Sequence, residues 1–304
     1  MQRFTGIHTM LYALFDDAEQ LSRASMRRQV GHSLAAGCDG ICILGLATEV
    51  QKLSSAERYL LVEWAAQDLA ESPGGANKPL GVTIAGNSVA EQIALARHAV
   101  ANRADWIILQ PPAVGTFGAT EYIRFFGRVA DAVDVPVAVQ NAPAYLGRGL
   151  SADDIAVLIT QHPNITHLKG EDSAVQIERI IQAVDGRMTV LNGRAGLELT
   201  DNLRAGCEGF ILAADTADVG IRVLEAWGRG DCVGADAYYR QGLPAITFVM
   251  QSLEHLITYG KRLYGLRVSE AIYDRAPCMA PTSFGVACVQ RWADDLGRLG
   301  GSPE

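Results

Sequence analysis

Lys169 is the side chain with the clearest chemical potential, and it lies in the segment Thr166-His167-Leu168-Lys169-Gly170-Glu171. If this segment is a β-strand, Lys169 and Glu171 lie on one face and the apolar Leu168 on the other. A lysine amine in an apolar pocket is more easily deprotonated, and the neutral amine attacks ketones. The segment is therefore typical of an enzyme that forms a Schiff base. A lysine that reaches solvent at a strand end and pairs with Glu171 would give the same pattern.

A second candidate is the segment Gly45-Leu46-Ala47-Thr48-Glu49, between an apolar run and a helical pattern. Glycine followed by small residues ahead of a helix can present backbone N–H groups to a carboxylate. Thr48 could add its hydroxyl. An ordinary turn between a strand and a helix looks much the same.

Two further segments carry polar groups at the ends of apolar runs. Gln140 and Asn141 could hydrogen-bond the hydroxyls of a sugar-derived substrate, although such amides often satisfy loop backbone. Gly193 would let the backbone approach a ligand. Arg194 is either a partner for a substrate carboxylate or a surface charge.

Eight short apolar runs alternate with segments of helical spacing, as expected of parallel strands covered on both faces. The expected strands are Ile7–Leu14, Gly40–Leu44, Leu80–Ala85, Trp106–Gln110, Val135–Gln140, Ile165–Lys169, Met188–Leu191 and Gly209–Leu212. Expected helices include Ser22–Ala36, one opening at each of Ser54, Ser88 and Ser151, Thr120–Ala132, Ala174–Val184, Gly196–Ala205 and Ala217–Trp227.

This order predicts an α/β fold, a (β/α)8 TIM barrel, whose active sites lie at the C-terminal strand ends. The motif Ala36–Ile41 recurs as Ala205–Phe210, which suggests equivalent units. An open doubly wound sheet is the rival, but Phe15–Glu19 stands where its glycine-rich loop would be. Residues 1–228 form the expected barrel. Residues 229–304 form an expected helical extension packed on it within one structural domain, with helices near Val233–Met250, Leu253–Tyr264 and Phe284–Leu296.

Composition limits the classes of protein that this chain can be. A formal net charge of −8 disfavours a nucleic-acid partner. No apolar stretch reaches the roughly 20 residues of a membrane helix, and the N-terminus does not read as a signal peptide. The six cysteines lack the spacing of a metal or redox motif, which favours free thiols in the cytoplasm. We expect no metal and no cofactor, because no ligand constellation or nucleotide fingerprint is present.

Taken together, these segments resemble the dihydrodipicolinate synthase / N-acetylneuraminate lyase superfamily along nearly the full chain. The resemblance rests on Gly45 with Glu49, Asn141-Ala142-Pro143, Lys169, Gly193 and Gly209-Phe210-Ile211. It implies a barrel with C-terminal helices, a homo-oligomer (tetramer or dimer), and Lys169 as the Schiff-base lysine. It also places Gly193 and Ile211 among the substrate-binding residues.

Several family residues are replaced. The family turn reads Gly-Thr-Thr-Gly-Glu, whereas Leu46 and Ala47 stand at the two threonine positions here. Gln140 replaces the catalytic tyrosine, and Ala113 replaces a tyrosine that a neighbouring subunit lends. The arginine expected shortly after the fifth strand is missing near Tyr145. These replacements argue against dihydrodipicolinate synthase activity itself.

Within this superfamily, the chain is similar to the L-2-keto-3-deoxyarabonate dehydratase branch. The similarity covers the strand Asp39–Leu44, Thr48-Glu49, Val139–Pro143, Lys169 with Glu171, and Leu224–Trp227. The resemblance implies a lyase that dehydrates a 2-keto-3-deoxy sugar acid. Lys169 would form the imine, and Glu171 would exchange the proton that Gln140 cannot. Thr48 would relay a proton through water, and Leu46, Ala47 and Thr48 would present N–H groups to the carboxylate.

Two alternatives share the premise of a bound keto acid. A retro-aldol lyase would use the same imine but release pyruvate. A non-catalytic keto-acid-binding homologue would explain the missing tyrosine and threonines. Product analysis separates the two lyases, and borohydride trapping of Lys169 tests the premise that both lyases share.

Overall fold

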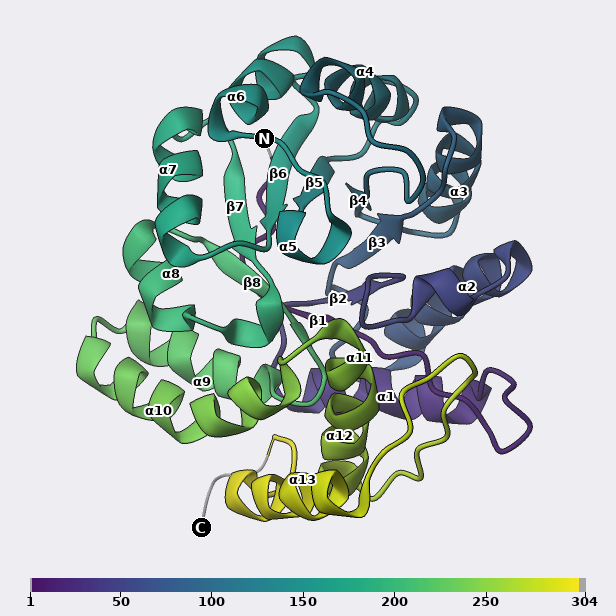
Figure 1. The fold of residues 1–304 in the computed structure, drawn as a ribbon, viewed down its shortest axis with the longest axis vertical. Helices are drawn as coiled ribbons and strands as arrows, with labels where there is room; N and C mark the ends of the chain where they lie inside the picture. Colours follow the sequence, from purple (N-terminus) through teal and green to yellow (C-terminus); the bar gives the residue numbers. More distant parts are fainter. Residues whose placement is uncertain (1, 301–304) are drawn as a thin grey trace.

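The computed structural model of the chain describes residues 2–300. Eight parallel strands close into a barrel in the order β1 to β8, with the helices arranged around it (Figure 1). The predicted (β/α)8 fold is confirmed. Its strands are β1 Gly6–Met10, β2 Gly40–Ile43, β3 Leu80–Ile84, β4 Trp106–Leu109, β5 Val137–Asn141, β6 Ile165–Gly170, β7 Thr189–Asn192 and β8 Gly209–Ala213.

One main helix follows each strand, and a short helix, α5 Pro143–Leu146, lies between β5 and its helix. The barrel helices are α1 Arg23–Ala35, α2 Ser55–Glu71, α3 Val89–Ala101, α4 Ala119–Ala130, α6 Ala152–Gln161, α7 Ala174–Val184, α8 Leu199–Ala205 and α9 Ala217–Gly228. The remaining helices are α10 Cys232–Val249, α11 Leu253–His255, α12 Lys261–Val268 and α13 Ser283–Leu296. Within residues 2–300, no helix has both the length and the apolar character to cross a membrane.

Local chemistry sets where several helices begin. The Ser54 side chain accepts a hydrogen bond from the Glu57 N–H, and the Glu57 carboxylate accepts from the Ser54 N–H. This capping box satisfies two N–H groups that the first turn of α2 leaves without helical partners. Ser88 caps α3 with one of the two bonds of a capping box. Its side chain accepts from the Glu91 N–H, but the Glu91 carboxylate accepts from the N–H of Asn87 and not from that of Ser88.

Two expected elements differ from those observed. The first strand ends at Met10 instead of Leu14, because the backbone N–H groups after Leu11 turn away from the sheet. Leu11 still donates to the Cys42 carbonyl at 2.9 Å, but Tyr12 donates to the side chain of Gln29 at 2.8 Å. The expected helix Leu253–Tyr264 is interrupted by a π-helical turn over Leu256–Gly260. Such turns are often found at functional sites.

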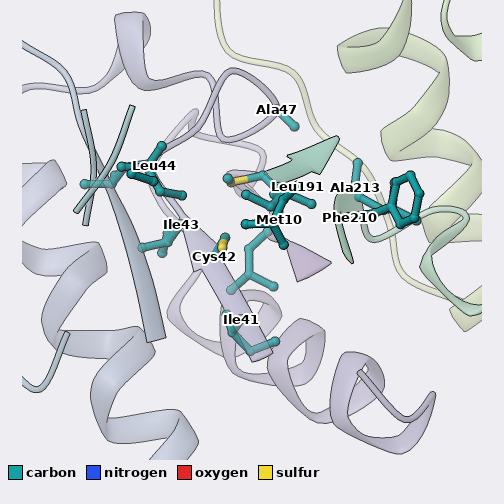
Figure 2. Close-up of a cluster of buried hydrophobic side chains, with 14 of the residues drawn as sticks. Met10, Ile41, Cys42, Ile43, Leu44, Ala47, Leu191, Phe210 and Ala213 are labelled. Carbon is teal, nitrogen blue, oxygen red and sulfur yellow. The ribbon is translucent and has the colours of Figure 1, made fainter. Parts of the chain in front are cut away.

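Side chains fill the barrel interior below the level of Lys169. At the N-terminal end, Phe4, His8, Trp106 and His167 pack together, with Phe4 stacked on Trp106 at 5.3 Å between ring centroids. Burial lowers the pKa of His8 and of His167 to about 4, so both rings are neutral. Higher up, apolar side chains that include Met10, Cys42 and Leu191 fill the lumen (Figure 2). A small cavity lined by Lys169 and Glu171 lies above this layer, at the C-terminal strand ends.

Candidate active site

Lys169 lies on β6 and points into the barrel lumen. Its register partners are Gln140 on β5 and Leu191 on β7. The residue is only 3% exposed, so it is not a lysine that reaches solvent at a strand end. Burial raises the pKa of the Cys42 thiol to about 12, an effect that the charge of nearby Lys169 partly offsets. Lys169 is therefore enclosed at the centre of the barrel.

Glu171, which directly follows β6, lies beside Lys169. Its Oε1 is 3.3 Å from the Lys169 Nζ, and Glu171 is 7% exposed. An added Cβ at Gly193 would lie 2.6 Å from the same Oε1. Gly193 therefore makes room for the Glu171 carboxylate, which gives a physical reason for a glycine at this position.

A chain of side-chain amides fixes the orientation of Glu171. Gln110 donates a hydrogen bond from Nε2 to the Gln140 Oε1 at 2.8 Å. This bond turns the Gln140 NH2 group toward Glu171, and it donates to the Glu171 Oε2. Gln92 in turn donates to the backbone carbonyl of Gln110. Gln140 thus holds the acid-base candidate instead of exchanging a proton itself.

The turn Gly45–Glu49 contributes two residues to the cavity. Leu46 and Ala47 line the cavity, and neither N–H donates a hydrogen bond within residues 2–300. Thr48 differs from the sequence expectation, because its N–H donates to the Gly45 carbonyl at 3.1 Å. A Cβ at Gly45 would lie 2.5 Å from the Met10 side chain. Of the three N–H groups expected to bind a carboxylate, those of Leu46 and Ala47 are therefore without a partner within residues 2–300, and that of Thr48 is not.

The expected water relay through Thr48 does not fit the structure. The Thr48 hydroxyl donates to the Leu11 carbonyl at 2.6 Å and is fully buried. Thr48 is not among the residues that line the cavity. Its hydroxyl instead ties the turn to the chain after β1.

Asn141 also has a structural role in place of the expected contact with substrate. Its Nδ2 donates to the Leu150 carbonyl, and its Oδ1 accepts from the Leu150 N–H at 2.8 Å. Both amide groups are thus used to hold the loop before α6. Ile211 on β8 lines the cavity.

The structure adds residues to the cavity that the sequence analysis did not assign to it. The cavity is lined by Met10, Leu46, Ala47, Tyr145, Lys169, Glu171, Arg194, Ala195, Ile211, Ala213, Met250 and Leu256. For Arg194 the sequence left two interpretations open, a partner for a substrate carboxylate or a surface charge. In the structure Arg194 lines the cavity, and 20% of its side chain is exposed. Met250 and Leu256 come from the region after the barrel, and no local pattern shows that this region reaches the site.

A larger hollow of about 520 Å³ lies on the other side of Leu46. It is bounded by the segment after β2 and by residues of α11, the π-helical turn and the loop before α13. Its lining includes neither Lys169 nor Glu171, so the smaller cavity is the one with reactive groups. Among residues 2–300, no three His, Cys, Asp or Glu side chains lie together as metal ligands would.

Comparison with known proteins identifies the family. The model of the dihydrodipicolinate synthetase family matches residues 3–281. The chain belongs to this family. It is a lyase of the dihydrodipicolinate synthetase family, as the sequence predicts.

Relatives within the family include sugar-acid enzymes. The chain is 31% identical to the L-2-keto-3-deoxyarabonate dehydratase of Azospirillum brasilense, over 80% of this chain and 79% of that protein. It is 29% identical to YagE of Escherichia coli (strain K12), over 78% of each chain. The name of YagE assigns it 2-dehydro-3-deoxy-D-gluconate aldolase activity provisionally.

Solved structures of the family share the fold. The crystal structure of YagE in complex with pyruvate superposes with a TM-score of 0.88 at 25% identity, covering 96% of this chain and 98% of that one. A Pseudomonas aeruginosa family member superposes with a TM-score of 0.90 at 22% identity, covering 97% and 100%. The second likeness supports the fold alone.

Proposed function

We propose that this lyase forms an imine between Lys169 and the C2 ketone of a 2-keto acid, and that it dehydrates a 2-keto-3-deoxy sugar acid. The observation that carries the proposal is the buried pair of Lys169 Nζ and Glu171 Oε1, 3.3 Å apart in one cavity. An amine and a carboxylate at this distance supply a nucleophile and a proton acceptor. The dehydratase activity named for the Azospirillum relative agrees with this reaction.

Binding would place the substrate carboxylate on the N–H groups of Leu46 and Ala47, whose turn lies across the cavity from Lys169. Glu171 accepts a proton from the Lys169 ammonium, and the neutral amine attacks C2. The C2 oxygen takes one proton from the attacking nitrogen and the proton held by Glu171, and it leaves as water, which returns Glu171 to its carboxylate form. The protonated imine that remains withdraws electrons from C3 and acidifies its protons.

Glu171 then takes a proton from C3, and the electron pair of that bond forms an enamine. The enamine expels the C4 hydroxyl, which takes a proton from Glu171 and leaves as water. The remaining conjugated imine has a C3–C4 double bond. Transfer of a proton from C5 to C3 gives the enol of an aldehyde, and hydrolysis by water releases a keto-acid semialdehyde and the free lysine.

A retro-aldol reaction is the second candidate, because YagE carries an aldolase name and was solved with pyruvate. In that reaction Glu171 would take the proton of the C4 hydroxyl, and the C3–C4 bond would break. The three-carbon enamine would then be protonated and hydrolysed to pyruvate. A non-catalytic keto-acid binder remains the third candidate, since Gln140 replaces the family tyrosine.

Borohydride trapping with product analysis tests these proposals. The chain has four lysines, at positions 52, 78, 169 and 261, so peptide mass assigns an adduct without ambiguity. We expect 2-keto acids to label Lys169, the variant Lys169→Met to lose the label, and the control Lys78→Gln to keep it. Semialdehyde from a 2-keto-3-deoxy sugar acid supports the dehydratase, and pyruvate supports the aldolase. An unlabelled Lys169 would exclude both lyase mechanisms.

We also propose that the chain is a cytoplasmic homo-oligomer, a dimer or a tetramer. Family resemblance supports the oligomer, and the cysteines that are free in the structure suit a reducing compartment. Light scattering of the purified chain tests the assembly, and a monomer at micromolar concentration would contradict it.

A further inference from the structure

A polar hollow of about 350 Å³ lies at the N-terminal end of the barrel, away from the cavity that holds Lys169. Its walls come from the chain before β1, from His8 on β1, and from the segments that lead into β2, β3 and β4. Active sites of this fold lie at the C-terminal strand ends, so the proposed chemistry makes no use of this hollow. Its charged and polar groups indicate what it can bind.

Two positive charges in the hollow have no partner of opposite charge. Lys78 and Arg103 line it, and neither forms an ion pair within residues 2–300, whereas Arg3 pairs with Glu208 at 2.5 Å. The Lys78 ammonium lies near the barrel interior, because its charge adds to burial, the main cause, in lowering the pKa of His8. Both cations are therefore available to a ligand that carries negative charge.

The backbone and one hydrogen bond hold the Arg103 guanidinium in place. Arg103 has a φ angle of 69°, in the left-handed region that residues with a Cβ rarely adopt. Its Nη2 donates to the Ala76 carbonyl in the wall before β3. Its Nη1 is buried and has no hydrogen-bond partner within residues 2–300. Because a buried N–H group without a partner is costly, this nitrogen requires an acceptor from the hollow.

His8 provides a buried acceptor in the same hollow. Its side chain has no exposed surface, and its Nε2 lies 3.2 Å from the Thr5 carbonyl. The proton of the neutral ring is therefore on Nε2, which leaves Nδ1 as an acceptor. Nδ1 has no partner within residues 2–300, and a Cβ at Gly40 would lie 2.4 Å from it. The glycine thus keeps a side chain away from this nitrogen.

The carboxylates of Asp39 and Asp105 also line the hollow. Asp39 Oδ2 accepts from the Ile7 N–H and Asp105 Oδ2 accepts from the Leu80 N–H, both at 2.8 Å. Each carboxylate thus holds the backbone at the start of a strand and keeps its Oδ1 for another donor. A bare oxyanion would be repelled by these carboxylates and would donate nothing to His8. A ligand that fits therefore needs hydroxyl groups as well as negative charge.

We propose that this hollow is a second ligand site, which binds a small phosphomonoester that also carries hydroxyl groups. A phosphomonoester carries between about 1.5 and 2 negative charges at pH 7, which matches the two unpaired cations. Lysine and arginine both bind phosphate oxygens through charged hydrogen bonds. The hydroxyl groups donate to His8 Nδ1 and to the aspartates. The site lies at the opposite end of the barrel from Lys169, so it does not depend on the proposed function.

Isothermal titration calorimetry with four small probes tests the proposal. Glycerol 3-phosphate has both the phosphate and the hydroxyl groups. Sulfate has charge without a donor, glycerol has donors without charge, and D-glycerate has donors with a single charge. We expect glycerol 3-phosphate to bind at least about 10-fold more tightly than each of the others, because each lacks hydrogen bonds that the site offers. No binding of glycerol 3-phosphate at millimolar concentration, or equal binding of any other probe, would overturn the proposal.

Variants assign the binding to this hollow. Arg103→Gln and Lys78→Gln should each raise the Kd for glycerol 3-phosphate about 10-fold, because each removes a charged hydrogen bond. The control Arg97→Gln removes an exposed positive charge of α3 outside the hollow and should leave the Kd unchanged. Lys169→Met should also leave it unchanged. Binding that is lost in Lys169→Met, or that is unaltered in both Arg103→Gln and Lys78→Gln, would contradict the assignment.

His8→Phe tests the acceptor in the hollow. The variant keeps an aromatic ring but removes Nδ1, so the preference for glycerol 3-phosphate over sulfate should fall. An unchanged preference would show that His8 does not accept from the ligand. Thermal unfolding of each variant without ligand shows whether its fold is intact.

Discussion

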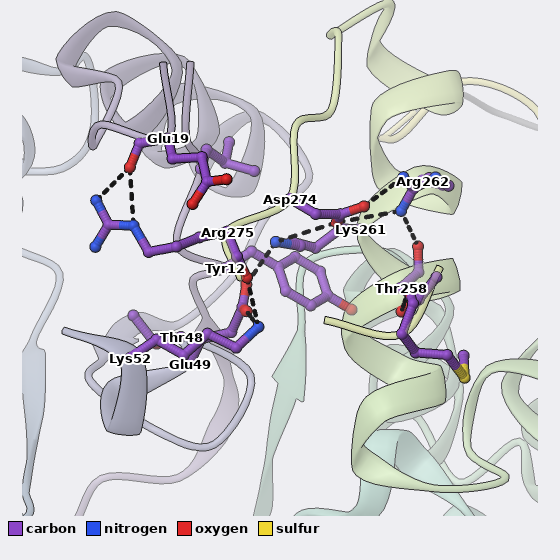
Figure 3. Close-up of polar contacts among 12 residues, drawn as sticks. Tyr12, Glu19, Thr48, Glu49, Lys52, Thr258, Lys261, Arg262, Asp274 and Arg275 are labelled. Carbon is purple, nitrogen blue, oxygen red and sulfur yellow. Dashed lines mark hydrogen bonds and ion pairs between the residues drawn. The ribbon is translucent and has the colours of Figure 1, made fainter. Parts of the chain in front are cut away.

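Glu49 and Lys261 are 212 residues apart in the sequence but form an ion pair whose two side chains have no exposed surface (Figure 3). The other carboxylate oxygen of Glu49 accepts a hydrogen bond from Lys52. The backbone N–H of Glu49 donates to the Leu46 carbonyl at 3.0 Å and closes the turn that contributes Leu46 and Ala47 to the cavity. Lys261 begins α12, directly after the π-helical turn that contributes Leu256 to the cavity. The pair therefore ties the carboxylate-binding turn to the C-terminal helices.

We predict that Lys261→Met weakens keto-acid binding as well as stability. Removing one partner of a buried ion pair costs about 3–5 kcal/mol of unfolding free energy. The turn should also become mobile, so the pyruvate concentration that half-saturates borohydride trapping should rise by about 10-fold. Lys261→Arg should restore much of the binding.

A matched control is available on the same helix. Arg267 and Asp218 form a second buried ion pair at 2.6 Å, which ties α12 to α9 away from the cavity. Arg267→Met should lower the free energy of unfolding to a similar extent but leave half-saturation by pyruvate unchanged. If both variants change trapping equally, Lys261 has a general structural role and does not position the turn.

Glu171→Gln should separate imine formation from dehydration. The amide keeps the size of the carboxylate but cannot accept a proton from C3. We expect the dehydration rate to fall by about 10²- to 10⁴-fold, the range typical of a lost general base. Pyruvate and borohydride should still label Lys169 in this variant on long incubation, although more slowly, because Glu171 no longer takes the proton of the lysine ammonium. Dehydration at the unaltered rate would show that another group is the base.

Gln140→Met should slow the reaction without preventing imine formation. The variant removes the amide that donates to the Glu171 carboxylate and that accepts from Gln110. Glu171 would then be free to turn away from C3, and kcat should fall by about 10-fold, since misplaced catalytic groups lose rate steeply. Single-turnover kinetics and trapping of Lys169 measure the two effects independently. A variant with full kcat would mean that Gln140 is only a packing residue.

Thr48→Val tests the proton relay expected from the sequence. The structure commits the Thr48 hydroxyl to the Leu11 carbonyl, so kcat should stay within about 2-fold of the original chain. Stability should fall by about 1 kcal/mol, because the variant loses one buried hydrogen bond. Urea unfolding and product formation are the measurements. A large loss of kcat at unchanged stability would instead support a proton relay through Thr48.

Stability should fall in mild acid because of His8 and His167. Their pKa values are lowered to about 4 by burial, so between pH 6.5 and 4 the unfolded chain binds protons that the folded chain does not. In this range each histidine lowers the free energy of unfolding by about 1.4 kcal/mol for each unit by which the pH falls. Asp215 acts oppositely below about pH 6, because burial raises its pKa to about 6.

His167→Asn isolates one of these contributions. Between about pH 7.5 and pH 5, the variant should lose about 2 kcal/mol less unfolding free energy than the original chain. Urea titrations at the two pH values give the comparison. His162→Asn is a control outside the aromatic cluster, because His162 follows α6 and contacts Asp131. Identical pH dependence in His167→Asn and the original chain would show that His167 is not buried in its neutral form.

The sequence by itself determined the barrel and the central chemistry. Each strand of a parallel barrel is buried on both faces, so its local sequence is a short apolar run. Eight such runs can be recognised in the sequence. Alternation along one strand likewise places Lys169 and Glu171 on the same face, because both residues belong to a single extended segment. No distant part of the chain is needed for either inference.

The tertiary structure decided what surrounds that pair. Closure of the barrel decides whether the Thr48 hydroxyl and the Asn141 amide face a ligand. It brings the Leu11 carbonyl beside Thr48 and the backbone of Leu150 beside Asn141, so both side chains bond to the protein itself. Leu256 reaches the cavity, and Lys261 reaches Glu49 of the adjoining turn, only because the C-terminal helices pack over the strand ends. Such contacts depend on long-range packing that no local pattern encodes, so the sequence supplied the reactive groups and the fold supplied their surroundings.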